Sequence, residues 1–145
     1  MTAGPFRRVL VGWDASPDAA EALCAATAIV RGDAGHVVAL TVLPAAPETE
    51  AADEQEGERA AIRRRAEERF QRLRGPEAAG VRMSLHIVEG SEVGKAVCAY
   101  AAEHGFDLLV LGRHGDGGRL RPRLGRVAEA AARSSAVPVL LLSAP

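Results

Sequence analysis

Glycine and arginine are concentrated in one stretch of the sequence, between Asp107 and Val127. It starts with the apolar run LLVL at 108–111, and five glycines and five arginines follow: Gly112, Gly115, Gly117, Gly118, Gly125, Arg113, Arg119, Arg121, Arg123 and Arg126. Glycine lets the backbone approach a ligand closely, and the amide N–H groups at a helix start attract anions. An alanine-rich, helix-forming segment follows Gly125. The order strand, glycine-rich basic loop and helix therefore indicates phosphate binding.

The spacing of three of these glycines is more specific than their number. Gly112, Gly115 and Gly125 are separated by two and nine residues. This pattern resembles the nucleotide-binding loop G-x2-G-x9-G of the universal stress protein family. The blocks VLVGWDAS at 9–16 and VPVLLL at 137–142 extend the resemblance over almost the whole chain. In nucleotide-binding members the last glycine precedes Ser or Thr, whereas this chain has Arg126 there.

The resemblance implies a site for ATP, with or without Mg²⁺. Asp14 matches a family residue at the adenosine, Val42 a position whose backbone contacts adenine, and His114 a position that lines the phosphates. Val127 would offer an amide N–H from the first helical turn. The expected nucleotide-binding residues, none of them catalytic, are Gly12, Trp13, Asp14, Val42, Leu111, Gly112, His114, Gly115, Gly125, Arg126 and Val127.

Several of these residues also have a structural explanation. Asp14 could accept a hydrogen bond from a ribose hydroxyl, or it could be a helix-start acid stabilised by backbone amides. Trp13 could stack on a base, or it could belong to the core. Val42 and Leu111 could be ordinary buried strand residues, and the glycines could be ordinary turn residues.

Arg126 leaves two alternatives for the function. Arginine makes charge-assisted, bidentate contacts with phosphate, so the site could keep its nucleotide with an altered preference. The larger side chain could instead fill the pocket, and the protein would then be a dimeric interaction module without a nucleotide, as in the family branch that lacks the full loop. We predict retained binding, by a stress-response or signalling module.

Composition is ordinary for a soluble domain. Of the 145 residues 48% are hydrophobic and 26% are charged, and the formal net charge is −1. We therefore expect a single domain over residues 1–145, with no general attraction to nucleic acid or membrane. No apolar run reaches the ~18 residues that span a bilayer, and no secretory signal is visible. The expected location is the cytoplasm.

Strand-like and helix-like segments alternate along the chain. Strands are predicted at 7–12, 36–43, 81–88, 108–111 and 139–142. Helices are predicted from Pro17 behind an N-cap Ser16, over 59–74, after a cap at Ser91, and over about 125–135. The acidic segment 45–58 is expected to be a mobile loop.

This alternation predicts an α/β fold with one doubly wound, open sheet of five parallel strands and four helices, resembling the adenine nucleotide alpha hydrolase-like class. Right-handed crossovers favour the strand order 3-2-1-4-5, which the resemblance also implies. Strands 1 and 4 are then neighbours at the switch point, where ligands bind. The apolar last strand is expected at an edge, and the resemblance implies a homodimer through it.

Other candidate sites are weak. Cys24 and Cys98 are expected to be buried free thiols, and the remaining histidines have no metal-ligand spacing. Residues 90–96 look like a Walker loop but have three residues between the glycines, with Ala96 after Lys95. An acidic cluster typical of receiver domains is missing beside Asp14. No enzyme is predicted, although Asp14 or His114 could support slow ATP hydrolysis by orienting water.

Overall fold

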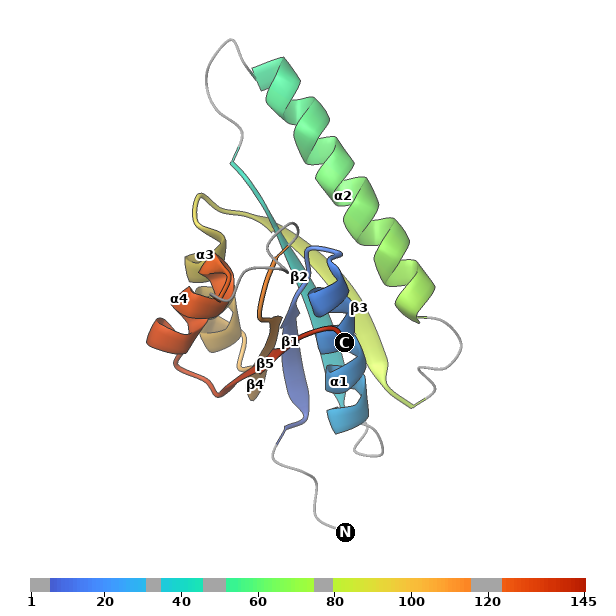
Figure 1. Cartoon of the computed structure of the whole chain (residues 1–145), viewed down its shortest axis with the longest axis vertical. Helices are drawn as coiled ribbons and strands as arrows, with labels where there is room; N and C mark the ends of the chain where they lie inside the picture. Colours follow the sequence, from blue (N-terminus) through green and yellow to red (C-terminus); the bar gives the residue numbers. More distant parts are fainter. Residues whose placement is uncertain (1–5, 31–34, 46–51, 75–79, 116–123) are drawn as a thin grey trace.

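The computed structural model describes residues 6–30, 35–45, 52–74, 80–115 and 124–145. In these residues one parallel sheet of five strands has the order β3-β2-β1-β4-β5 (Figure 1). The strands are β1 (Arg8–Gly12), β2 (His36–Leu43), β3 (Arg82–Glu89), β4 (Leu108–Gly112) and β5 (Val139–Leu142). The predicted fold class and strand order are confirmed, and β3 and β5 are the predicted edges.

Helices cover both faces of the sheet (Figure 1). They are α1 (Pro17–Val30), α2 (Ala52–Arg74), α3 (Val93–Glu103) and α4 (Arg126–Ser134). Successive strand residues point to opposite faces, so Val9 and Val11 pack on the side of α1 and α2. Leu10 lies between them in sequence and packs on the side of α3 and α4. Because both faces are buried, the central strands are continuous apolar runs rather than alternating ones.

The start of α1 agrees with its sequence signals. Ser16 Oγ accepts a hydrogen bond of 3.2 Å from the Ala19 amide, and Pro17 is the first helical residue. The predicted apolar stripe, Ala19, Leu23, Ala26 and Val30, is buried. Cys24 lies outside this stripe and is exposed, so its predicted burial was wrong. Cys98 is partly buried, and burial raises the pKa of its thiol.

Helix α2 is longer than predicted, because it begins at Ala52 rather than at Arg59. The prediction of a loop over 45–58 was wrong for residues 52–58, and 46–51 lie outside the described residues. Glu, Ala and Gln, which account for five of the residues 52–58, form helices well, and acidic residues are favourable near a helix N-terminus. Arg59 is 9% exposed and pairs with Glu56 and Glu89, which fixes this part of α2 against the end of β3.

The predicted cap of α3 was also wrong. Its N-cap residue is Glu92, with no side-chain hydrogen bond, and Ser91 lies one residue earlier. The serine was chosen because of its residue type, but the end of β3 and the turn at Gly90 set the path of the chain. Gly90 donates its amide N–H to Leu43 O at 3.0 Å.

Phe70 should account for much of the stability that α2 contributes. Its side chain is 1% exposed, whereas Leu73, in the next turn, is 42% exposed. We expect Phe70→Ala to lower the free energy of unfolding by about 3–5 kcal/mol, because it leaves a cavity between α2 and the sheet. Leu73→Ala is the matched control and should cost less than about 1 kcal/mol. Urea denaturation measures both, and equal losses would contradict this packing.

Candidate functional site

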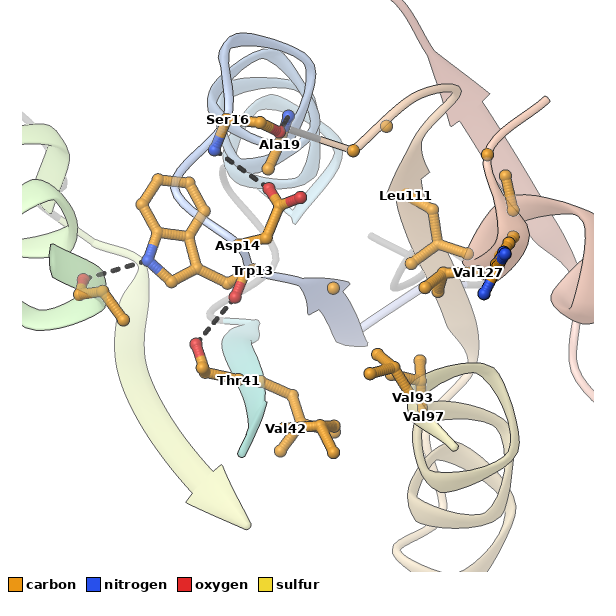
Figure 2. A pocket seen from close by; sticks show the side chains of 18 of the residues that line it. Trp13, Asp14, Ser16, Ala19, Thr41, Val42, Val93, Val97, Leu111 and Val127 are labelled. Carbon is orange, nitrogen blue, oxygen red and sulfur yellow. Dashed lines mark hydrogen bonds between the residues drawn. The ribbon is translucent and has the colours of Figure 1, made fainter. Parts of the chain in front are cut away.

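A cavity of about 560 Å³ lies at the carboxyl ends of β1, β2 and β4, the switch point of the sheet (Figure 2). The residues predicted to bind nucleotide all line it: Gly12, Trp13, Asp14, Val42, Leu111, Gly112, His114, Gly115, Gly125, Arg126 and Val127. The structure therefore brings together residues from opposite ends of the chain. Their role in binding stays a prediction.

Trp13 is a core residue. Its side chain is 3% exposed, and its indole Nε1 donates to Ala66 O in α2 at 3.0 Å. Its own carbonyl accepts a 2.7 Å hydrogen bond from Thr41 Oγ1. Figure 2 shows the ring pointing toward α2, away from Val42 and Leu111. These contacts support the structural explanation of Trp13 and give α2 a polar attachment to the end of β1.

Asp14 lies at the turn between β1 and α1. Its Oδ1 accepts a 2.9 Å hydrogen bond from the Ser16 amide, so it does support the helix start. The residue between them, Ala15, has φ of +63°, a left-handed conformation that costs a non-glycine residue roughly 1–2 kcal/mol. Asp14 is nevertheless exposed and lines the cavity. A Cβ on Gly115 would lie 3.2 Å from its Oδ2, so the β1 turn and the loop after β4 are in contact.

One end of the cavity is an apolar slot. Val42 and Leu111 form it together with Val93, Val97 and Val127, which Figure 2 shows gathered on one side. Val97 and Leu111 are almost completely buried, whereas Val93 is 42% exposed at the edge of the slot. The sequence did not indicate the two α3 residues, Val93 and Val97, as part of the site.

The other end of the cavity is formed by the loop glycines and the N-terminus of α4. Gly125 is the N-cap residue, and no side chain caps this helix end. Its amide N–H donates to Arg113 O at 2.7 Å, which draws the two sides of the loop together. A Cβ on Gly112 would lie 2.6 Å from Asp18 Cβ, so this glycine is required for packing against α1. An uncapped helix N-terminus beside glycines is a suitable place for an anion.

A buried pair, Asp18 and His114, joins α1 to this loop. Asp18 Oδ2 lies 3.2 Å from both the amide N and the Nδ1 of His114, and Oδ1 accepts a 2.7 Å hydrogen bond from the Ala144 amide. Burial by itself would raise the pKa of Asp18, but the hydrogen bonds from Ala144 and His114 outweigh it and lower the pKa. Of this pair, the sequence indicated only His114 as part of the site, and it did not indicate Asp18. The available signal was that Asp18 lies four residues, about one helical turn, before Ala22, so that both are on the buried side of α1.

Two arginines from different helices line the cavity, Arg126 from α4 and Arg65 from α2. Arg126 is exposed, and the cavity remains open beside it. In this arrangement the guanidinium does not fill the pocket. The sequence did not indicate Arg65 as a cavity residue, because it is one of many charged residues in the helix predicted over 59–74.

The other sequence candidates lie outside the site or lack support. Lys95 of the Walker-like segment is 80% exposed and pairs with Glu92 at 3.2 Å, although Gly90 and Ser91 line the cavity. Within the described ranges no three His, Cys, Asp or Glu residues are arranged to hold a metal ion. A search of the same ranges found no helix with the length and apolar character needed to cross a membrane.

The sheet topology and the position of the cavity define a class, the doubly wound α/β proteins that bind ligands at the switch point. The model of the universal stress protein family matches residues 5–143, and the chain belongs to this family. The predicted family is thus confirmed. A search of the curated proteins found no match.

Solved structures of similar proteins share the fold. A universal stress protein in complex with cAMP is 26% identical, with a TM-score of 0.68, and the match covers 98% of this chain and 100% of that one. UspA from Lactobacillus plantarum is 24% identical, with a TM-score of 0.74 and coverages of 94% and 97%. A family protein from Arabidopsis thaliana with AMP bound is 18% identical, with a TM-score of 0.67 and coverages of 95% and 92%.

The Asp18 hydrogen bonds should make stability depend on pH. In the unfolded chain Asp18 has a pKa near 3.8, and folding lowers it. The stabilisation is therefore fully present above that value and is lost as the pH falls through the lower, folded-state pKa. We expect Asp18→Asn to lower the free energy of unfolding by about 1–3 kcal/mol at pH 7, with a smaller deficit below about pH 4.

Thermal or urea unfolding between pH 7 and pH 3 measures this deficit. Glu21→Gln is the control, because Glu21 is an exposed acid on the same helix. Its unfolding curve should stay close to that of the wild type at neutral pH. A deficit for Asp18→Asn that is constant across the range would contradict the assignment.

Proposed function

We propose that this protein binds an adenine nucleotide, with ATP as its ligand, and acts as a stress-response or signalling module. One observation carries the proposal: a single cavity has an apolar slot at one end and an uncapped helix N-terminus with a glycine-rich loop at the other. A nucleotide has the same division, because its base is flat and largely apolar on its faces and its phosphates are anionic. The volume lies within the range of small-molecule sites, roughly 300–1,000 Å³.

The base is assigned to the valine-lined slot. Val42 and Leu111 lie on one side and Val93 and Val97 on another, and all belong to regular elements rather than loops. Val42 is at the end of β2, where its backbone groups can form hydrogen bonds with the polar edge of a base. Ribose hydroxyls would then come near Asp14, whose carboxylate is exposed between the slot and the loop.

The phosphates are assigned to the loop and the start of α4. Gly112, Gly115 and Gly125 line the cavity there, and the α4 dipole is positive at this end. Arg126 is in the first turn of α4 and adds a full positive charge beside the cavity. No protein site for Mg²⁺ is proposed, because a triphosphate can itself bring the ion. The relatives solved with cAMP and with AMP support the choice of an adenine nucleotide.

Binding rather than turnover is proposed as the activity. Within the described residues His114 is hydrogen-bonded to Asp18 and to no hydroxyl or thiol, and the nearby Ser16 hydroxyl caps α1. A paired nucleophile and base are therefore missing from this part of the chain. Slow hydrolysis through a water oriented by Asp14 or His114 is the secondary possibility. We propose the cytoplasm as the location and no nucleic acid or membrane as a partner.

A homodimer is the second element of the proposal. β5 is an edge strand, and its residues Val139, Leu140, Leu141 and Leu142 are all only half-buried. An apolar edge strand offers unpaired backbone groups and side chains to a second copy. This observation also favours the alternative function, a dimeric interaction module, if nucleotide does not bind.

ATP should raise the melting temperature of the purified protein. A ligand at a hundred times its Kd stabilises the native state by about 2.7 kcal/mol, which raises Tm by roughly 5–10 °C in a domain of this size. AMP should do so to a smaller extent, and GTP less than ATP. Differential scanning fluorimetry and titration calorimetry measure the effect. Unchanged Tm and no heat at millimolar ATP would sink the binding proposal.

Two variants locate the ligand. Gly115→Val should abolish the ATP-induced shift, because the side chain enters the cavity beside Asp14. Gly57→Ala is its control, since a Cβ there meets nothing within 4 Å. Arg126→Ser should weaken the binding of ATP by about tenfold or more, because a charge-assisted contact is lost. Tighter ATP binding by Arg126→Ser would mean that the arginine blocks the site.

Light scattering at micromolar concentration should give the mass of a dimer. Leu141→Lys should shift it toward the monomer, because a charged side chain would be placed at the edge strand. Leu73→Lys is the control, as Leu73 is an exposed leucine far from β5 in sequence. A monomeric mass for the wild-type protein would rule out the dimer.

A further inference from the structure

The buried pair formed by Asp18 and His114 has a property that phosphate binding alone does not explain. Both residues are at least nine-tenths buried, with His114 9% and Asp18 2% exposed. His114 lines the cavity, yet its ring atom Nε2 is buried and has no hydrogen-bond partner among the residues that the structure describes. An unpaired buried polar atom costs free energy. Since His114 lines the cavity, a ligand bound there is the partner considered for this atom.

The hydrogen bonds of Asp18 indicate which ring nitrogen of His114 donates a proton to its carboxylate. Its Oδ1 accepts from the Ala144 amide and its Oδ2 from the His114 amide, and backbone amides are donors in every protonation state. Both carboxylate oxygens are therefore acceptors, and these contacts lower the pKa of Asp18, which keeps it ionised near neutral pH. Nδ1 of His114, 3.2 Å from Oδ2, must then be the donor of that contact.

This arrangement determines what Nε2 can do. In a neutral imidazole with the proton on Nδ1, Nε2 has a lone pair and repels a phosphate oxygen. Only the imidazolium donates from both nitrogens, to Asp18 on one side and to an anion on the other. The ion triad of carboxylate, imidazolium and phosphate alternates in charge, and burial strengthens both contacts.

Among the described residues, the other charged groups close to His114 come from the loop, from α4 and from the β1 turn, and Arg65 of α2 also lines the cavity. Arg113 adjoins His114 in the loop, Arg126 is at the start of α4, and Asp14 lies beside Gly115. Arg113, Arg126 and Asp14 are exposed, so solvent screens them more than it screens Asp18. The tail after β5, which supplies the Ala144 amide, has no ionisable side chain in Ser143, Ala144 or Pro145.

We propose that His114 binds a phosphate group of the nucleotide as an imidazolium positioned by Asp18, so that binding takes up a proton from the solvent. The inference rests on the proposed nucleotide-binding function and adds a proton to it. Asp18 is a positioning residue, and His114 is the residue that touches the ligand. The affinity for a phosphorylated ligand should consequently fall as the pH rises, while the affinity for adenosine should not.

Titration calorimetry at pH 8 with AMP tests the proposal. At this pH an ordinary histidine is neutral and the phosphate of AMP is fully ionised. The observed enthalpy is compared in HEPES and Tris buffers, whose ionisation enthalpies differ and which carry no phosphate to compete with AMP, and the slope gives the protons taken up. We expect a slope between about 0.5 and 1 for AMP and zero for adenosine. His114→Gln should remove the slope, and Asp18→Asn should reduce it.

The outcomes separate the inference from the proposed function. If neither AMP nor adenosine binds, both fail. If AMP binds to the wild-type protein with zero slope, or if the slope survives in a folded His114→Gln variant, the proton is not on His114 and only the inference fails. The four histidines also permit a readout without changing His114. In a variant with His36, His86 and His104 replaced by Gln, AMP should bring the ring nitrogen NMR shifts of His114 to imidazolium values, and unchanged shifts would overturn the inference.

Discussion

The carboxylate of Asp18 holds together three segments that are far apart in the sequence. It belongs to the first turn of α1, and its hydrogen bonds reach His114 after β4 and Ala144 after β5. The contact is possible because Gly112 has no side chain, since a Cβ there would lie 2.6 Å from Asp18 Cβ. The first turn of α1 can therefore pack directly against the carboxyl end of β4. The position of the loop relative to β1, and with it the shape of the cavity, depends on this contact.

The fold could be predicted where a short segment contains its own signal. The apolar runs of β1, β2 and β4 indicated strands, and the alternation of strands with helices indicated a parallel sheet. Ser16 and Pro17 fixed the start of α1 because capping is a local interaction. The start of α2 was predicted too late in the sequence, because the many acidic residues at 45–58 are typical of loops as well as of helices. Its actual support includes the pairing of Arg59 with Glu89, thirty residues away, which no local pattern reveals.

Much of the site could be predicted for a topological reason. Parallel strands end at the same edge of a sheet, so residues that follow β1 and β4 must meet once the strand order is known. What could not be predicted is which side chains of the covering helices reach the same place. Val93 and Val97, in the first turns of α3, and Arg65, in the middle of α2, line the cavity. The role of Asp18 could not be predicted, because it depends on a hydrogen bond with His114, which is 96 residues away.

Arg126 fits this picture better as part of a binding site than as a plug. It is the first residue of α4, at the positive end of the helix, where a cation is unfavourable by roughly 0.3–1 kcal/mol. None of the ion pairs among the described residues neutralises it. The helix end and the guanidinium therefore adjoin one cavity, and among the described residues their positive charge lacks compensation. An anion placed there would compensate both at once, whereas an arginine that served only to close the pocket would add to the imbalance.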